Sequence, residues 1–174
     1  MSNKDSAAIT YIRANPPTKA HELVYNRIIG IPNADHYVFV SSKSGDPKNP
    51  LTGVEKLPFL KKMFKAANVE IVTGGFIEGI KKVSPRKNLY IVVGGDRAGP
   101  IEVLANKYNH KLYDFDNIEI VNVGNRLANP LSATKMRQWA VDQDKDSFFK
   151  GASDKLSNLD KQKLYDLVRS HLVK

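Results

Sequence analysis

The stretch Tyr11-Ile-Arg-Ala-Asn-Pro-Pro-Thr-Lys-Ala-His21 decides how the rest of the chain is interpreted. Before it, residues 7–12 form a short apolar and β-branched run that is typical of a buried strand. After it, apolar residues recur at helical spacing, which predicts a helix of about three turns. Thr18 stands where a helix N-cap belongs, and His21 follows in the first turn. A helix start behind a proline-stiffened turn predicts an anion site that faces His21. An ordinary strand, turn and helix with a structural histidine is the alternative.

The amino-acid composition limits the class of protein. A length of 174 residues suffices for one domain with a full hydrophobic core and is too short for two ordinary domains. Apolar residues make up 41% and charged residues 26%, as in soluble globular proteins, and no apolar run is long enough to span a bilayer. The N-terminus lacks the apolar stretch of a secretory signal, and the absence of cysteine excludes disulfides and thiolate chemistry. We therefore expect one domain over residues 1–174, in the cytoplasm and without a membrane partner.

The chain is strongly basic, with a formal net charge of +9 and a pI of about 9.6. Such a balance favours anionic partners, namely nucleic acid, polyphosphate or an acidic surface. The lysines are scattered rather than gathered in one tract, which argues against a dedicated nucleic-acid tail. A surface that is basic only for solubility explains the charge equally well.

Strand-like and helix-like segments alternate along the chain. The run at residues 89–93 is apolar throughout, which indicates a central strand covered on both faces. This alternation predicts an α/β fold, a Rossmann-like doubly wound sheet of about five parallel strands with helices on both faces and C-terminal helices. The core is expected over residues 7–142 and a C-terminal helical extension over 144–174. The expected strands cover residues 7–12, 36–42, 69–73, 89–93 and 118–123.

Capping residues locate the expected helices. Thr52 and Glu55 form a predicted capping box, and Pro58 should either kink that helix or mark its regular start. Later helices are expected at residues 76–83, 100–109, 132–142 and 159–173. The apolar face of the helix that follows Thr52 is expected to contain Val54, Leu57, Leu60, Met63, Phe64 and Ala67.

Polar turns follow several of the strands, at the edge of the sheet where open α/β folds bind ligands. Gly94-Gly95-Asp96 comes after the central strand; its glycines allow a ligand close to the backbone, and Asp96 could accept from ribose hydroxyls. A plain turn with an Asp-capped helix is the alternative. Ser132 is the predicted N-cap of a helix whose first turns carry Thr134, Lys135 and Arg137. Because cations there oppose the helix macrodipole, their presence favours a bound anion such as a triphosphate.

Three motifs together resemble those of the cytidylyltransferase-like nucleotidyltransferases. Pro17-Thr-Lys-Ala-His21 is similar to their Thr/His-x-Gly-His motif, and Leu131-Ser-Ala-Thr-Lys-Met-Arg137 to their Ile-Ser-Ser-Thr-x-Ile-Arg motif. Gly94-Gly95-Asp96 matches the glycine-aspartate element between them. The chain most resembles the small nucleotidyltransferases encoded by large bacteriophages, including the stretches at residues 48–51 and 59–64. A phage-encoded protein would work in the host cytoplasm.

The resemblance implies a reaction and a set of site residues. A phosphate of the acceptor attacks the α-phosphorus of a nucleoside triphosphate, and pyrophosphate leaves with Mg²⁺ present. His21 would bond the α-phosphate, Thr18 would contact phosphates or orient the attacking group, and Lys43 would face the acceptor phosphate, although Lys19, Lys48 or Arg13 could serve instead. The catalytic set is thus His21, Thr18, Lys43 and Arg137. The nucleotide-binding set is Ala14, Asn15, Thr18, His21, Gly94, Gly95, Asp96, Ser132, Thr134 and Arg137.

Departures from the family pattern leave the acceptor open. Ala20 replaces the glycine before His21, and Thr18 replaces a histidine common in the nicotinamide mononucleotide enzymes. Those enzymes also carry an aromatic residue after the aspartate, which Arg97-Ala-Gly-Pro100 lacks. We expect transfer of a nucleoside monophosphate to a small phosphorylated acceptor, with ATP favoured over CTP as donor. A homo-oligomer is compatible with the sequence. The alternative is a catalytically inactive nucleotide- or nucleic-acid-binding protein, such as a phage structural component.

Overall fold

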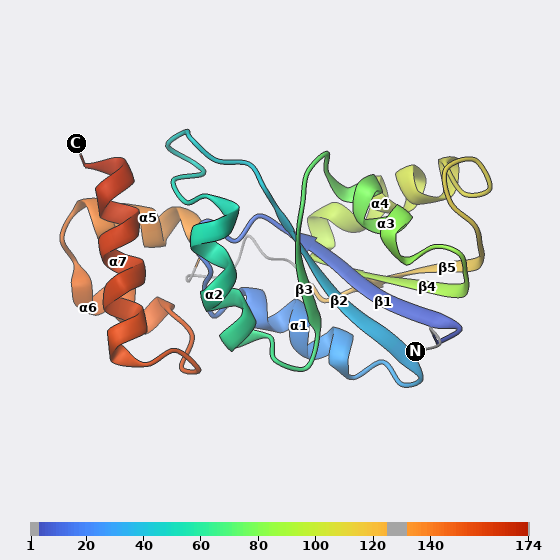
Figure 1. Ribbon diagram of the computed structural model, residues 1–174, viewed down its shortest axis with the longest axis horizontal. Coiled ribbons are helices and arrows are strands. Elements are labelled where there is room, and N and C mark those ends of the chain that lie inside the picture. Colours follow the sequence, from blue (N-terminus) through green and yellow to red (C-terminus); the bar gives the residue numbers. More distant parts are fainter. Residues whose placement is uncertain (1–3, 125–131, 174) are drawn as a thin grey trace.

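A five-stranded parallel sheet with helices on both faces forms the centre of the molecule, as the alternation of segments predicts (Figure 1). The computed structural model describes residues 4–124 and 132–173. The strands run in the order β3-β2-β1-β4-β5, and every neighbouring pair is parallel. They are β1 (Ser6–Ile12), β2 (Ala34–Ser41), β3 (Asn68–Val72), β4 (Arg86–Val93) and β5 (Phe115–Asn122).

Seven helices occur in the described ranges, and those between the strands cover both faces of the sheet. They are α1 (His21–Ile29), α2 (Gly53–Met63), α3 (Phe76–Val83), α4 (Gly95–Lys107), α5 (Ala133–Val141), α6 (Lys145–Gly151) and α7 (Asn158–Leu172). One apolar core joins α1 and α2 with the C-terminal helices α5 to α7, and a second joins α3 and α4 to the other face. This division is the doubly wound arrangement predicted from the sequence.

Alternate residues of β1 face the two cores. Ala8 and Ile12 belong to the core under α1 and α2, whereas Ala7 and Ile9 belong to the core under α3 and α4. Thr10, the polar residue of this buried strand, donates its hydroxyl hydrogen to the carbonyl of Val92 at 2.7 Å. The order in which the strands are added to the sheet reverses between β1 and β4, so the topological switch point lies beside the carboxyl end of β1.

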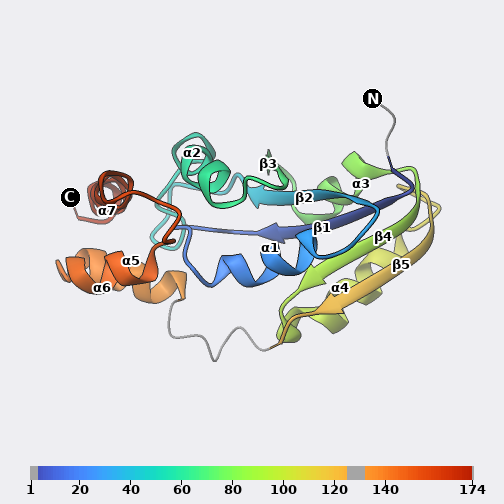
Figure 2. The ribbon, with the colours of Figure 1, turned by 90° about the horizontal axis from the view of Figure 1, so that it is seen from below.

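The C-terminal helices lie beyond the carboxyl ends of the strands, and the strand arrowheads in Figure 2 point toward them. Leu164 and Val168 of α7 are fully buried, which confirms that its apolar face packs on the rest of the chain. The amide of Lys19 donates to the carbonyl of Gly151 at 2.9 Å, so α6 touches the β1–α1 turn directly. Helix α6 was not predicted; it has seven residues and Asp144 caps it by accepting from the Ser147 amide.

Several boundaries differ from the predictions. Helix α4 begins at Gly95, earlier than the predicted start near Pro100, because Gly94 serves as its N-cap and Pro100 is accommodated inside it. Helix α2 begins at Gly53 with the predicted capping box and continues through Pro58. Val54, predicted on its apolar face, is 84% exposed. None of the helices in the described ranges combines the length and apolar character that crossing a bilayer requires.

Candidate active site

The β1–α1 turn is tied to the loop before α2 by one buried side chain. Asn15 donates its amide to the carbonyl of Leu51 at 2.9 Å and accepts from the Leu51 amide at 2.8 Å. Ala14, just before it, is buried and adopts a left-handed backbone with φ of 51°, a region that non-glycine residues seldom occupy. Both residues were predicted to bind nucleotide. The structure engages the Asn15 side chain with Leu51, so this side chain fixes the turn against the loop before α2.

Thr18 and His21 lie together in the same turn. The Thr18 amide donates to Nδ1 of His21 at 3.0 Å, and the Thr18 hydroxyl lies 3.4 Å from the same atom. Both side chains are buried. Because Nδ1 accepts from a backbone amide, a neutral His21 ring carries its proton on Nε2. The contact therefore orients the imidazole and selects its tautomer.

Thr18 is not the N-cap of α1, contrary to the prediction. The helix begins at His21 with Ala20 as its N-cap, and the Thr18 hydroxyl instead accepts from the Ala20 amide at 3.1 Å. The amides of His21 and Glu22 bond three residues back, so a tighter turn precedes the helix. Ala20 has helical angles, φ −60° and ψ −32°, which any residue adopts, so the backbone does not require the family's glycine there.

Arg137 joins the helix α5 to the β1–α1 turn across 122 residues of sequence. Its Nη1 donates to the carbonyl of Asn15 at 2.8 Å, and its Nη2 to the hydroxyl of Thr134 at 3.2 Å. Ser132 is the N-cap of α5, as predicted, and accepts from the Lys135 amide. The described structure therefore brings Thr134 and Arg137 to the turn that holds Thr18 and His21.

Arg137 lies close to a second cation, Arg13. Burial lowers the pKa of Arg137, and the neighbouring guanidinium of Arg13 lowers it further, whereas the carboxylate of Asp46 acts in the opposite sense. Asp46 lies in the β2–α2 loop, where it accepts from the side chain of Asn49 and from the amide of Lys48. A site that holds cations close together in this way is suited to an anion.

The Gly94–Asp96 turn follows β4, which pairs with β1 across the switch point. Gly94 is the N-cap of α4, and the Gly95 amide donates to the carbonyl of Gly124 at 2.6 Å. A Cβ on Gly95 would lie 3.3 Å from Gly124 and from the side chain of Asn122, so a larger residue would press on β5. Asp96 stands in the first turn of α4. A helix does start here, but the predicted capping by Asp96 is wrong, because Gly94 is the N-cap and no side chain caps the helix.

Lys43 lies in the loop just beyond the end of β2, whereas Arg137 lies in α5. The Lys43 amide donates to the Ser41 hydroxyl at 3.1 Å, and the Lys43 side chain is solvent-exposed. The Lys43 ammonium is one of the groups that hold the pKa of Asp46 below its usual range; the side chain of Asn49 has the largest such effect. Asp46 therefore interacts electrostatically with both Lys43 and Arg137.

The sequence analysis missed Lys56. Its side chain is completely buried in α2, and Nζ donates to the carbonyls of Arg13 at 2.9 Å and Ser41 at 2.7 Å. Burial, and to a smaller extent the Arg13 guanidinium, lowers its pKa to about 8. A signal was available: Lys56 has helical spacing to the buried residues Phe59, Leu60 and Met63, so it occupies the buried stripe of α2.

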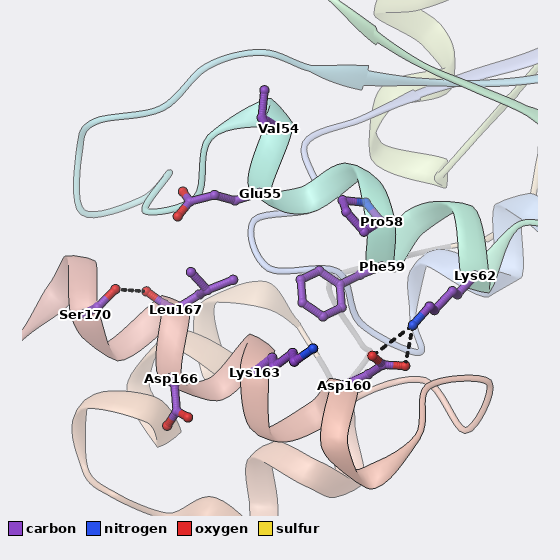
Figure 3. Close-up of a pocket in the computed structure, with 10 residues that line it drawn as sticks. All are labelled: Val54, Glu55, Pro58, Phe59, Lys62, Asp160, Lys163, Asp166, Leu167 and Ser170. Carbon is purple, nitrogen blue, oxygen red and sulfur yellow. Dashed lines mark hydrogen bonds and ion pairs between the residues drawn. The ribbon is translucent and has the colours of Figure 1, made fainter.

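A separate groove of about 630 Å³ lies between α2 and α7, away from the strand ends (Figure 3). Its walls are mainly apolar, with Pro58 and Phe59 on α2 and Leu167 on α7. Lys62 and Asp160 form an ion pair of 2.9 Å at its edge. None of the predicted site residues lines this groove. In the described residues no group of three or more acidic or histidine side chains could hold a metal ion. Leu131, the first residue of the Leu131–Arg137 motif, lies outside the described ranges.

Comparison with known proteins supports the fold. No family model and no curated protein matches the sequence. The structure is similar to that of a Vibrio parahaemolyticus protein assigned as a nicotinate-nucleotide adenylyltransferase. The TM-score is 0.58 at 14% sequence identity, and the match covers 94% of this chain and 98% of the other. The predicted Rossmann-like α/β class is therefore confirmed.

Proposed function

We propose that this protein is a nucleotidyltransferase that transfers a nucleoside monophosphate from a nucleoside triphosphate to a small phosphorylated acceptor. One observation carries the proposal: Arg137 bonds the carbonyl of Asn15 in the turn that also holds Thr18 and His21. Residues from two distant motifs thus meet beside the switch point of the sheet, where such folds bind ligands. The fold neighbour is assigned to the same class of reaction.

The reaction needs positioning and charge neutralisation more than covalent chemistry. An oxygen of the acceptor phosphate forms a bond to the α-phosphorus as the bond to the bridging oxygen of the β-phosphate breaks, and pyrophosphate departs. His21, with Nδ1 engaged by the Thr18 amide, would donate from Nε2 to an α-phosphate oxygen and stabilise the charge that develops there. Arg137 and Thr134 would bind the outer phosphates. Asp96 and the Gly94–Gly95 backbone would hold the nucleoside, and Lys43 would face the acceptor phosphate.

Mg²⁺ would arrive with the triphosphate. This ion keeps most of its ligands from water and substrate phosphates and needs only one or two protein carboxylates. The described residues fit that mode, because Asp46 stands singly in the loop after β2 and Asp96 in the first turn of α4. When bound, Mg²⁺ neutralises phosphate charge; the protein residues position the reactants.

ATP is the favoured donor over CTP, and the acceptor class is a phosphomonoester. The fold neighbour's nicotinate nucleotide is one candidate acceptor. The absence of an aromatic residue in the stretch at 97–100 leaves other phosphomonoesters equally open.

Pyrophosphate release with ATP and CTP against a panel of phosphomonoesters, including nicotinate mononucleotide, tests the proposal. His21→Asn is the sharpest variant, because the amide oxygen can still accept from Thr18 while the Nε2 donor is lost. We expect turnover to fall on the order of 10²-fold, with His110→Asn, an exposed histidine on the β5 side, as the matched control. Full activity in His21→Asn would refute the mechanism. Salt-sensitive nucleic-acid binding with no thermal shift by triphosphate would instead favour the inactive binding protein.

A further inference from the structure

Lys56 is a fully buried cation whose hydrogen bonds go to backbone carbonyls. Its ammonium donates to Arg13, the first residue after β1, and to Ser41, the last residue of β2. In the described residues no ion pair joins it to a carboxylate. Burying an unpaired charge is costly, so a hydrophobic residue of similar size would serve stability at least as well.

The two carbonyls mark the points where two loops of the candidate site begin. Directly after Arg13 comes the turn with Asn15, Thr18 and His21, and directly after Ser41 comes the loop with Lys43. Strands β1 and β2 are paired in register up to Ile12 and Val40, and Lys56 holds the chain just beyond that pairing. The Lys56 ammonium therefore fixes the distance between the two loops at the point where they leave the sheet.

The charged group that acts on Lys56 is itself a cation. Arg13, at the end of β1, acts on both Lys56 and Arg137. The carboxylate beside Lys56 on its own helix, Glu55, lines the α2–α7 groove and pairs with His171 at 3.0 Å (Figure 3). Asp46, in the β2–α2 loop, acts on Arg137. The positive potential at the strand ends is thus strengthened by a charge that solvent does not screen.

We propose that Lys56 is a positioning residue of the candidate active site, whose buried ammonium ties the ends of β1 and β2 and aligns the nucleotide turn with the acceptor-side loop. This assignment rests on the proposed nucleotidyltransferase function. Since a small misplacement of reacting groups costs much in rate, the effect should appear in turnover with both substrates bound rather than in nucleotide affinity.

Hydrogen exchange tests the positioning role without reference to activity. Lys56→Met removes the ammonium and keeps the length of the side chain. Lys62→Met, at a half-exposed lysine of the same helix that pairs with Asp160 of α7, is the matched control. We expect faster amide exchange in residues 13–20 and 42–49 of Lys56→Met and wild-type exchange in Lys62→Met. Unchanged protection of both segments in Lys56→Met would overturn the proposal whatever the protein's activity.

Kinetics supply the second test. In Lys56→Met we expect kcat to fall about 10- to 100-fold, with the Kd for ATP within about threefold of wild type. Wild-type kcat should decline at alkaline pH, because Lys56, with its pKa of about 8, gives up its proton there. Lys56→Arg should restore most of the rate and should not show this decline, because arginine stays charged. An unaltered kcat in Lys56→Met, or the same alkaline decline in Lys56→Arg, would also overturn it. If wild-type protein releases no pyrophosphate from any triphosphate, the proposed function fails, and the exchange experiment still decides the positioning role.

Discussion

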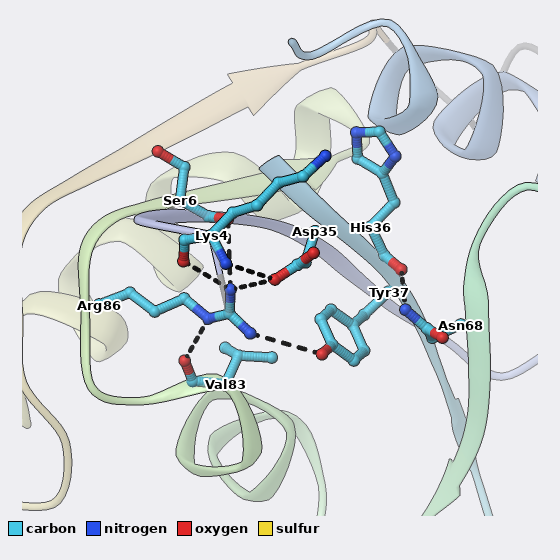
Figure 4. A network of polar contacts seen from close by, with 8 residues as sticks. All are labelled: Lys4, Ser6, Asp35, His36, Tyr37, Asn68, Val83 and Arg86. Atoms are coloured by element: carbon cyan, nitrogen blue, oxygen red, sulfur yellow. Dashed lines mark hydrogen bonds and ion pairs between the residues drawn. The ribbon is translucent and has the colours of Figure 1, made fainter. Parts of the chain in front are cut away.

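A cation is buried at each end of the sheet, and the two cations have different kinds of partner. At the amino end, the side chain of Arg86 is 2% exposed and forms an ion pair with Asp35 (Figure 4). It also donates to the carbonyls of Lys4 and Val83, each at 2.8 Å. At the carboxyl end, Lys56 has carbonyl partners without a carboxylate.

This difference separates a structural charge from a functional one. The hydrogen bond from Arg86 holds the pKa of Asp35 below its usual range, which shows that the protein itself neutralises that cation. At the other end, burial lowers the pKa values of Lys56 and Arg137, and the nearby guanidinium of Arg13 lowers both further. Such an arrangement of cations is typical of sites where a ligand supplies negative charge, and it supports our proposal that the carboxyl end binds an anion.

The largest expected effect comes from breaking the neutralised pair. Arg86→Met leaves the carbonyls of Lys4 and Val83 without this donor and the Asp35 carboxylate without its cation. Removal of one partner of a buried pair costs about 3–5 kcal/mol. Urea unfolding measures the loss. Arg27→Met, at an exposed position on α1, should change the free energy of unfolding by no more than about 0.5 kcal/mol. A loss below about 1 kcal/mol in Arg86→Met would mean that the amino end is not a closed structural unit.

Arg137→Met should have the opposite profile, with a loss in binding rather than in stability. Removing one charged donor to a phosphate costs about 1.5–3 kcal/mol, which is about 10- to 100-fold in the Kd for ATP. Isothermal titration measures the affinity, and Lys135→Met, exposed on the same helix, controls for the loss of net charge. Equal losses in the two variants would show that the site responds to overall charge and not to Arg137.

Local sequence signals predicted much of this fold. Helix α3 has the predicted bounds, and the capping box of Thr52 and Glu55 starts α2 as expected. The buried character of β4 correctly placed it inside the sheet, beside β1 and β5. These features depend on neighbouring residues, so the sequence displays them directly.

Local sequence signals could not predict contacts between residues that are far apart in the chain. The Asn15 amide looked available for nucleotide, but its partner Leu51 is 36 residues away. A lysine normally belongs to the surface, so the apolar face of α2 was assigned with Val54, which is exposed, and without Lys56, which is buried. Arg137 was predicted to approach the turn of His21 from its motif, and the structure gives the atom it bonds, the carbonyl of Asn15.

The pH dependence of the free energy of unfolding should show the contribution of the Arg86–Asp35 pair at the amino end of the sheet. Because the folded-state pKa of Asp35 is lowered, its pairing stabilises the protein above the pKa of the unfolded chain and is lost as pH falls through the folded value. Asp35→Asn should therefore destabilise by about 1–2 kcal/mol at neutral pH, and the gap to wild type should close below about pH 4. Unfolding curves at several pH values measure it. A gap that stays constant down to pH 3 would assign the loss to packing and not to charge.

The smallest effect is expected for the ion pair that belongs to neither end. His171 and Glu55 lie at the rim of the α2–α7 groove, with side chains 37% and 25% exposed. Burial acts to raise the pKa of Glu55, but the Thr52 amide and His171 outweigh it, so the pKa is lowered overall. A double-mutant cycle with Glu55→Gln and His171→Gln should give a coupling of less than about 1 kcal/mol, as for other partly exposed pairs. A coupling energy as large as the loss of unfolding free energy in Arg86→Met would contradict the difference that we draw between buried and partly exposed pairs. Partly exposed charges would then contribute as much to stability as buried ones.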